Sequence, residues 1–270
     1  MQISRLPALT GWRWVIEGFR ILGRQPVALL SITFINLMLM GLSLVVPLVG
    51  SMGPLLLTPA FMVGMMRAAR MADSGQNPSP LVLFSGFKEQ QGRAWRPLLI
   101  LGVINAVATM IALSAATLAG GELLVEMATG RISPADPRAA DAPLGWAALV
   151  FLMIYLPVQL ATWYAPMFIA WDGIPLTKAM FFSIAAILRN KAAFLIYAGG
   201  WFLVALVGML VLRIVQGMLG GSPMLMTLVL YPVWLGGLAA VYCSFWATYR
   251  DAVDHTGSSR ATDSASHLTP

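Results

Sequence analysis

Six long apolar stretches dominate the chain, and short segments between them hold most of the charged residues. The stretches cover residues 27–49, 53–71, 97–119, 144–171, 192–214 and 223–248. A helix needs about 20 mainly apolar residues to cross the hydrocarbon layer, because it rises about 1.5 Å per residue. Strands of a membrane β-barrel would alternate apolar and polar positions instead. The pattern therefore predicts an all-α, polytopic membrane helical bundle with six transmembrane helices.

The composition agrees with a membrane protein. Of the 270 residues, 59% are hydrophobic and 10% are charged, whereas an ordinary soluble domain has about 45–50% apolar and about 25% charged residues. A soluble fold with so few charges could not cover its surface with polar groups. We therefore expect a single membrane domain over residues 1–253 and a polar, disordered tail over residues 254–270.

The basic residues fall mainly on one side of the predicted spans. Four precede the first span, five lie in residues 67–96, three in residues 172–191 and two in the tail, which makes 14 of the 17. Cytoplasmic loops of membrane proteins carry such an excess of Lys and Arg, so both termini are predicted to be cytoplasmic. The same distribution accounts for the net charge of +6 without a nucleic-acid partner.

One unit, an interfacial helix followed by two spans, fits the chain three times. The interfacial helices would begin after Pro7, Pro80 and Pro175, because proline suits the first turn of a helix. The second unit is the longest, since a polar and proline-rich segment over residues 120–143, predicted to be irregular, is inserted at its hairpin tip. A three-fold duplication and a chance similarity of apolar segments both explain this pattern.

Each second span contains a proline within an apolar stretch. We expect Pro59, Pro157 and Pro232 to kink their helices, because proline removes one helical hydrogen bond. Broken helices at matching repeat positions can mark the binding site of a transporter. Proline is also common in membrane helices that have no such role.

The first interfacial helix has the clearest amphipathic pattern. Arg13, Glu17, Arg20 and Arg24 recur at intervals of four, three and four, which places them on one face. Apolar residues occupy the other side, as in helices that lie in the headgroup layer. Arg13, Arg20 and Arg24 are therefore candidate contacts for anionic lipid. Each basic residue near the membrane surface contributes about 1 kcal/mol of electrostatic attraction. The alternative is a helix that only anchors the first span.

The spans lack the residues that intramembrane catalysis needs. No Asp, Glu, Lys or His lies well inside a span, and the sequence contains no HExxH motif, P-loop or GxGxxG fingerprint. The single cysteine, Cys243, excludes an internal disulfide and a multi-cysteine metal site. We therefore expect no enzymatic activity, no cofactor and no metal.

Three polar residues lie deep inside the predicted spans. Asn36, Asn105 and Gln159 are about 8 to 12 positions from the predicted cytoplasmic ends, or about 12–18 Å deep. One hypothesis is a polar layer that binds a headgroup or small solute. The other is hydrogen bonding between helices, worth about 0.6 kcal/mol on average, which we favour.

Three sequence features occur together in this chain. They are Trp12-Arg13-Trp14 at the start of the first interfacial helix, Gly18-Phe19-Arg20 farther along that helix before Pro26, and a proline between apolar residues in each second span. In these features the chain resembles a group of uncharacterised six-span inner-membrane proteins from proteobacteria. It is more loosely similar to the membrane domain fused to some glycerophosphodiester phosphodiesterases, although it has no phosphodiesterase catalytic domain. The resemblance implies a multi-pass protein of the bacterial inner membrane and implies no activity.

The expected function is that of a non-enzymatic inner-membrane component that organises lipids or partner proteins in the envelope. Its partners would be the bilayer and, at the cytoplasmic face, anionic lipids. The alternative is a small-solute or lipid transporter that works through the kinked helices and the layer of Asn36, Asn105 and Gln159.

Overall fold

The computed structural model describes residues 2–45, 52–128, 144–218 and 223–254, and this part of the chain is mostly helical. The elements are β1 (Gln2–Ile3), α1 (Thr10–Arg24), α2 (Pro26–Val45), α3 (Gly53–Asp73), the 3-10 helix η1 (Pro80–Phe84), α4 (Ser85–Gly92), α5 (Trp95–Leu118), α6 (Glu122–Ala128), α7 (Leu144–Thr162), α8 (Ala165–Ala170), α9 (Leu176–Arg189), α10 (Lys191–Met218), α11 (Pro223–Ala252) and β2 (Val253–Asp254). The predicted disorder of the tail falls on residues 255–270, which lie outside the described residues.

Long helices occupy all six predicted spans. Five segments of the described chain are long and apolar enough to cross a membrane: Pro26–Val45, Trp95–Leu118, Gly145–Ala170, Lys191–Gly217 and Leu230–Ala252. The remaining long helix, α3, carries Arg67, Arg70 and Asp73 in its last two turns and is less apolar. The all-α membrane fold is confirmed, and a sixth crossing by α3 stays a prediction.

The predicted fourth span, residues 144–171, is interrupted between α7 and α8. Pro166 lies in the first turn of α8, where it supplies no N–H and disfavours a helical bond to the carbonyl four residues earlier. The hydroxyl of Ser183, on α9, fills the break: its Oγ donates to Leu160 O at 2.6 Å and accepts from Tyr164 N at 3.0 Å. Two backbone groups at the break, the Leu160 carbonyl and the Tyr164 N–H, are thereby satisfied.

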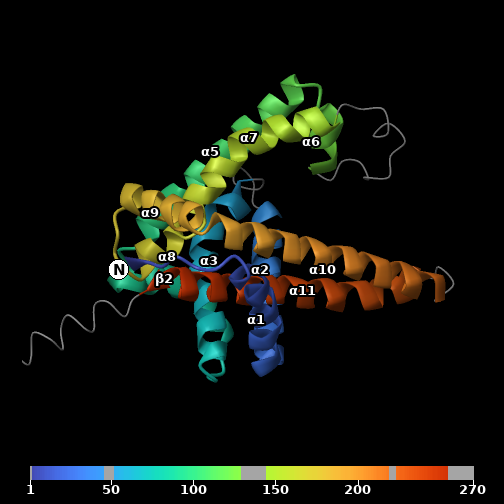
Figure 1. The fold of residues 1–270 in the computed structure, drawn as a ribbon, viewed down its shortest axis with the longest axis horizontal. Helices are drawn as coiled ribbons and strands as arrows, with labels where there is room; N and C mark the ends of the chain where they lie inside the picture. The colour runs from blue at the N-terminus through green and yellow to red at the C-terminus, as the bar shows by residue number, and fades with distance from the viewer. Residues whose placement is uncertain (1, 46–51, 129–143, 219–222, 255–270) are drawn as a thin grey trace, which may run out of the picture.

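The helical hairpins meet at one end of the molecule and diverge from it. In Figure 1, α5 and α7 lead together towards α6, α10 and α11 lead away in another direction, and β2 lies near α8. The main hydrophobic core lies at the shared end, around α3, α8 and Tyr249 of α11, and we call this region the base. Farther out, apolar side chains are exposed, and only 11% of the α10 span is buried. Such extended exposed apolar surface suits a lipid environment.

The base is built around α3, the least apolar of the long helices. Eleven of its 21 residues are buried, and it contacts α1, α2, α4, α5, α8 and α11. Helix α5 approaches α3 closely at Gly102: a Cβ at this position would lie only 2.3 Å from Leu56 O. Protein therefore encloses α3, whereas the outer parts of the other long helices are exposed.

The two ends of the described chain lie side by side. In the β1–β2 pair, Gln2 lies opposite Asp254 and Ile3 opposite Val253, in antiparallel register. Asn190 is 2% exposed, and its side chain binds the residues that follow β1. It accepts a hydrogen bond from the Leu6 N–H at 2.9 Å and donates one to the Ser4 carbonyl at 2.9 Å. Both ends are thus fixed to the base.

α1 packs against α10 and α11 through small residues. A Cβ on Gly11 would lie 2.0 Å from Ala193 O, and a Cβ on Gly18 would lie 2.5 Å from Ala240 O. Trp14, on the same face, is fully buried. Glycine is required at these positions because the helix backbones are too close to admit a side chain.

The opposite apolar face of α1 remains exposed. Trp12, Ile16 and Phe19 are 41%, 52% and 44% exposed. The helix predicted to have an apolar and a charged face therefore has a third face, which packs on protein. Hydropathy does not separate the apolar face that meets lipid from the one that meets another helix.

The order of elements fits the predicted repeat, with two differences. α1 and α9 follow the first and third prolines as expected, but the segment after Pro80 forms a 3-10 helix and then α4, whose helical geometry is lost over Glu89–Gln91. Residues 122–128 of the hairpin tip form α6 instead of an irregular loop, while residues 129–143 lie outside the described part. Duplication of the unit stays a prediction.

The contact of α1 with α11 provides a test of the fold. Gly18→Ala would place a methyl group against Ala240 O, and we expect it to lower the free energy of unfolding by about 1–3 kcal/mol. Gly23→Ala, on the same helix, meets no atom within 4 Å and should leave stability equal or slightly higher. Thermal unfolding of the purified protein in detergent measures both variants. Equal melting temperatures for Gly18→Ala and the wild type would contradict the packing.

Candidate functional site at the base of the hairpins

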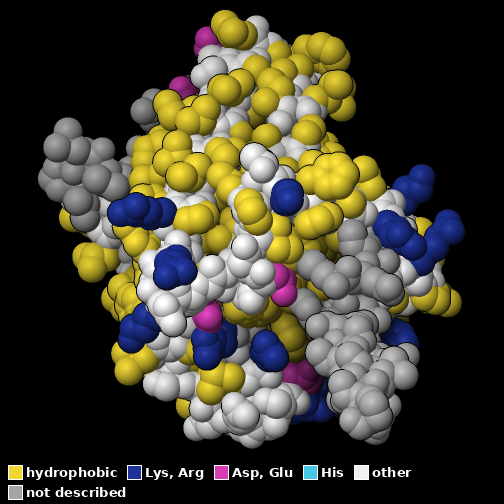
Figure 2. Space-filling view, turned by 90° about the vertical axis from the view of Figure 1, so that its left-hand side faces the viewer, with side chains coloured by type: hydrophobic (Ala, Val, Ile, Leu, Met, Phe, Trp, Pro, Cys, Tyr) yellow, Lys and Arg dark blue, Asp and Glu magenta, His cyan; other side chains and the backbone are white. Residues whose placement is uncertain are grey.

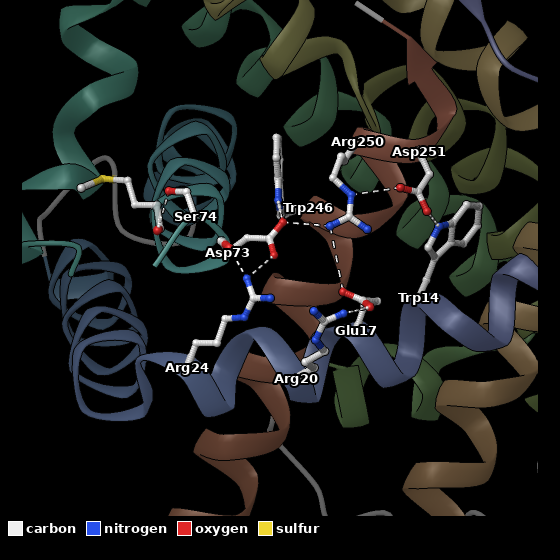
Figure 3. A network of polar contacts seen from close by, with 10 residues as sticks. Trp14, Glu17, Arg20, Arg24, Asp73, Ser74, Trp246, Arg250 and Asp251 are labelled. Atoms are coloured by element: carbon white, nitrogen blue, oxygen red, sulfur yellow. Dashed lines mark hydrogen bonds and ion pairs between the residues drawn. The ribbon is translucent and has the colours of Figure 1, made fainter. Parts of the chain in front are cut away.

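Asp73, the last residue of α3, joins three helices through its carboxylate. It accepts from Arg24 Nη1 of α1 at 2.9 Å and from Arg250 Nη1 of α11 at 2.8 Å. Trp246 Nε1 of α11 donates to the same carboxylate at 3.1 Å, and Arg24 also donates to the Asp73 carbonyl. Figure 3 shows the Asp73 side chain between α1 and α11, with the two guanidinium groups directed towards it.

The network extends from Arg250 along the contact between α1 and α11. Arg250 Nε donates to Asp251 Oδ1 at 3.0 Å, and Trp14 Nε1 donates to Asp251 Oδ2 at 3.0 Å. Glu17 pairs with Arg20 at 2.6 Å and lies 4.0 Å from Arg250. These contacts, drawn in Figure 3, align the charged face of α1 with the end of α11.

The electrostatics of Asp73 explain why it needs two arginines. The C-terminus of a helix carries a partial negative charge, so a carboxylate at the end of α3 adds to an unfavourable potential. Its side chain is 16% exposed, whereas those of Arg24 and Arg250 are 34% and 36% exposed. Charge-assisted hydrogen bonds contribute about 1.5–3 kcal/mol each when shielded, and less where solvent reaches them.

A pocket of about 680 Å³ opens beside this network. Its lining includes Arg67, Arg70, Ser74 and Gln76 from α3 and the residues after it, Glu89 from α4 and Trp171 from the end of α8. Arg67 forms an ion pair with Glu89 across the pocket. The guanidinium of Arg70 lies 5.8 Å from the ring centroid of Trp171 and 5.7 Å from that of Trp246. The pocket thus combines two cations, one anion and aromatic surface.

A left-handed turn follows Glu89, one of the residues that line the pocket. Gln90 and Gln91 have φ of 53° and 57°, and Gly92 follows with φ of 79°. Left-handed geometry costs a non-glycine residue about 1–2 kcal/mol. The Gln90 amide compensates, since its Nε2 donates to Ile169 O at 2.7 Å and to Ala170 O at 3.3 Å, at the end of α8. The turn therefore holds Glu89 at a fixed place opposite Arg67.

The structure brings together two of the three predicted polar residues. Gln159 Nε2 of α7 donates to Asn105 Oδ1 of α5 at 3.3 Å. The pair lines a small pocket of about 140 Å³, which Pro59 and Trp163 also line. This volume holds about four or five water molecules. The pair therefore links α5 to α7 next to a space too small for most solutes.

Asn36 lies apart from that pair. It is 3% exposed on α2 and faces Tyr242 of α11. It is not among the residues that line the small pocket. The three residues thus do not form one layer around a common cavity in the described structure.

The three candidate lipid arginines of α1 differ in their surroundings. Arg24 is engaged by Asp73 and Arg20 by Glu17, although the Arg20 side chain is still 57% exposed. Arg13 is exposed and makes no ion pair with a described residue. Of the three, Arg13 is the one whose full charge faces the surroundings.

The three predicted kink positions lie within continuous helices. Pro59 is in α3, Pro157 in α7 and Pro232 in α11, and the helix continues past each of them. Kinks at these positions stay a prediction. The break that the structure shows is the one at Pro166.

Arg67, Arg70 and Asp73 were not predicted as site residues. They recur at intervals of three along the end of α3, which places them near one another on a helix. In the sequence analysis the two arginines are counted only among the basic residues that set the orientation of the protein in the membrane. Their spacing was visible, but their partners on α1, α8 and α11 are distant in the sequence.

Basic side chains gather on the face at the base. Figure 2 shows Lys and Arg on this face, with a hydrophobic surface above them and a few acidic side chains between them. Helices of membrane length, apolar outer faces and a charged base together define a polytopic α-helical membrane protein.

Comparison with known proteins agrees with this class. The chain is 34% identical over 252 residues to the probable inner membrane protein BTH_II0599 of Burkholderia thailandensis, covering 93% of each chain. The chain belongs to the family of that protein and is an integral inner-membrane protein. The resemblance to uncharacterised inner-membrane proteins is thereby confirmed. No family model matches the chain, and no solved structure matches it.

The role of Asp73 can be tested by removing its charge. Asp73→Asn should lower the free energy of unfolding by about 2–3 kcal/mol, because two arginines lose their shared counter-ion. Glu122→Gln, which neutralises an exposed carboxylate on α6, is the matched control and should change stability little. Thermal unfolding in detergent at low and high salt measures both. An unchanged melting temperature for Asp73→Asn would show that the network does not hold the three helices.

Proposed function

We propose that this protein is a non-enzymatic component of the inner membrane that organises anionic lipids at the cytoplasmic interface. The observation that carries the proposal is the excess of unpaired cations at the base. Within the described residues, only Arg20, Arg24, Arg67 and Arg250 form ion pairs. The exposed basic residues without such a partner near the interfacial helices are Arg5, Arg13, Arg70, Lys88, Arg93, Arg96, Lys178, Arg189 and Lys191.

Anionic lipid is the partner that this arrangement favours. A basic residue close to an anionic leaflet contributes about 1 kcal/mol of attraction, and several in one layer act together. The exposed apolar residues of α1, such as Phe19 at 44% exposure, would reach the acyl boundary next to these charges. Cations and apolar side chains at the same level are the usual features of a headgroup-binding surface.

The orientation follows from the same residues. The positive-inside rule favours the base, with both termini, on the cytoplasmic side. The β1–β2 pair supports an even number of crossings, because an odd number would separate the chain ends across the membrane. Six crossings, with α3 as the additional one, agree with this pairing.

The transporter alternative has less support. It needs a polar path through the spans, and Asn105 and Gln159 satisfy one another beside a pocket of about 140 Å³. Asn36 lies on another face, towards α11. The geometry favours hydrogen bonds that fix helix packing over a route for a solute.

The proposed topology can be tested with reporter fusions. Fusions at residue 130 should be active in the periplasm, and fusions at residues 85, 180 and 260 should be active in the cytoplasm, because the basic segments face inwards. Paired reporters that work on opposite sides of the membrane serve as mutual controls. A fusion at residue 85 reporting from the periplasm would contradict either the orientation or the crossing by α3, and the fusion at residue 260 would show which of the two is wrong.

The lipid proposal can be tested in bilayers of defined composition. The purified protein in nanodiscs should retain phosphatidylglycerol over phosphatidylcholine, by a factor of about three or more, and high salt should weaken the preference. Native mass spectrometry of the released complexes counts the retained lipids. Equal retention of both lipids at low salt would contradict the proposed function.

A further inference from the structure

One cation in the pocket at the base has no counter-ion among the residues that the structure describes. Arg70 makes no ion pair and donates no hydrogen bond to any described residue, while its neighbours Arg67, Arg24 and Arg250 are all paired with carboxylates. Two nearby carboxylates are already engaged: Glu89 by Arg67 and Asp73 by Arg24 and Arg250. The unmatched charge therefore faces the pocket that Arg70 lines.

Two tryptophans hold the guanidinium of Arg70 in place. Trp171 and Trp246 lie with their ring centroids 5.8 Å and 5.7 Å from its central carbon, within the range of cation–π attraction. No N–H group of this guanidinium donates a hydrogen bond to a described residue, so its N–H edge is available. That edge is a planar fork that matches two oxygens of a phosphate group, and a fork already held in place loses little entropy on binding.

The charge of the lining favours a phosphate with one negative charge. Arg67 and Arg70 contribute two positive charges and Glu89 one negative charge, which leaves one positive charge. A phosphodiester carries a single negative charge and balances it. Ser74 and Gln76 add a hydroxyl and an amide for the polar groups of a headgroup, and the volume of about 680 Å³ is large enough for one.

The depth of the pocket matches the headgroup layer. Trp171 directly follows the candidate span Gly145–Ala170, and Trp246 lies near the end of the span Leu230–Ala252. Span ends in membrane proteins are located at the level of lipid headgroups. A lipid phosphodiester is therefore present at high local concentration at this depth.

The turn that follows Glu89 is held in place at an energetic cost. The left-handed residues Gln90 and Gln91 are held there by hydrogen bonds to the end of α8. Strained backbone that the surrounding structure keeps in place is typical of ligand-binding sites. The turn keeps Glu89 opposite Arg67 and thereby limits the charge of the lining.

We propose that the pocket between the end of α3, α4 and α8 binds the phosphodiester headgroup of an anionic phospholipid, with Arg70 as its bidentate partner. This proposal rests on the proposed function, since it assigns the lipid preference to one site. Arg67 adds a second positive charge, and Glu89 sets the net charge that the headgroup must balance.

The experiment titrates short-chain phosphatidylglycerol onto the detergent-purified protein and counts bound lipid by native mass spectrometry. Arg70→Gln should weaken the tightest binding event by about tenfold or more, since a hydrogen-bonded charge is removed. Arg70→Lys keeps the charge but loses the fork, and should fall between Arg70→Gln and the wild type. Arg213→Gln, which removes an exposed arginine of α10 that does not line the pocket, is the matched control and should bind within about twofold of the wild type.

A gain of affinity separates the proposal from a loss of folding. Glu89→Gln removes the only carboxylate among the lining residues described, and should tighten lipid binding about threefold. A misfolded variant would not bind more tightly. Circular dichroism and thermal unfolding check that Arg70→Gln and Arg70→Lys retain the fold.

A second arm distinguishes a lipid from a soluble source of phosphate. It titrates sn-glycerol 3-phosphate and inorganic phosphate onto the same variants. Lipid binding that depends on Arg70 supports the proposal, whereas binding of the soluble phosphates alone, dependent on Arg70, supports a phosphate site but overturns the lipid as its ligand. A preference for phosphatidylglycerol that survives Arg70→Gln overturns the site and leaves the proposed function standing. No preference in wild-type nanodiscs overturns the proposed function, and with it the lipid as ligand.

Discussion

The carboxylate of Asp73 is the interaction on which the arrangement of the base depends. It stands at the C-terminus of α3, where the helix itself is already partly negative, so the fold requires cations at this point. Arg24 arrives from α1 and Arg250 from α11, both within 2.9 Å, and Trp246 adds an N–H donor. Asp73 thereby links α1 and α11 to α3, the buried centre of the base, in addition to the apolar contacts that α3 makes with both helices. The pocket beside it depends on the same alignment, because Trp246 binds Asp73 with its N–H and faces Arg70 with its ring.

Hydropathy predicted the long helices because a long apolar stretch is a local property of the sequence. The apolar stretches from 97 to 119 and from 192 to 214 became α5 and α10 with small shifts at their ends. The same method left α3 ambiguous, since its charged end lowers its hydropathy although its sides are buried. Hydropathy also treats residues 144–171 as one stretch, although the helix is interrupted after Thr162, where Pro166 follows. Backbone groups freed there bind a serine about twenty residues farther along the chain. Apolar residues are found both where a helix is buried by protein and where it faces lipid, and only the fold distinguishes the two environments.

The candidate site was less predictable than the fold, because its residues are combined across the sequence. Arg67 and Arg70 were visible as basic residues, but no local pattern places Trp171 or Glu89 beside them. The deep polar residues Asn105 and Gln159 were found from the sequence, and they meet one another. The sequence also does not distinguish the surroundings of the tryptophans near span ends. Trp146 is 60% exposed, as an interfacial anchor should be, whereas Trp246 is 9% exposed and belongs to the interior of the base.

The pairing of the chain ends imposes an order on biosynthesis. β2 and Arg250 lie in the last described turns of the protein, whereas their partners β1 and Asp73 belong to its first third. Helices α1 to α3 are therefore made while their contacts with α11 do not yet exist. Asp73 tolerates this delay because it sits at a helix end, where water can solvate it, and not in the hydrocarbon, where an unpaired charge would be expelled. The Asp73 network and the β1–β2 pair can be completed only after the final helix has been made, because it supplies the missing arginine and leads into the missing strand.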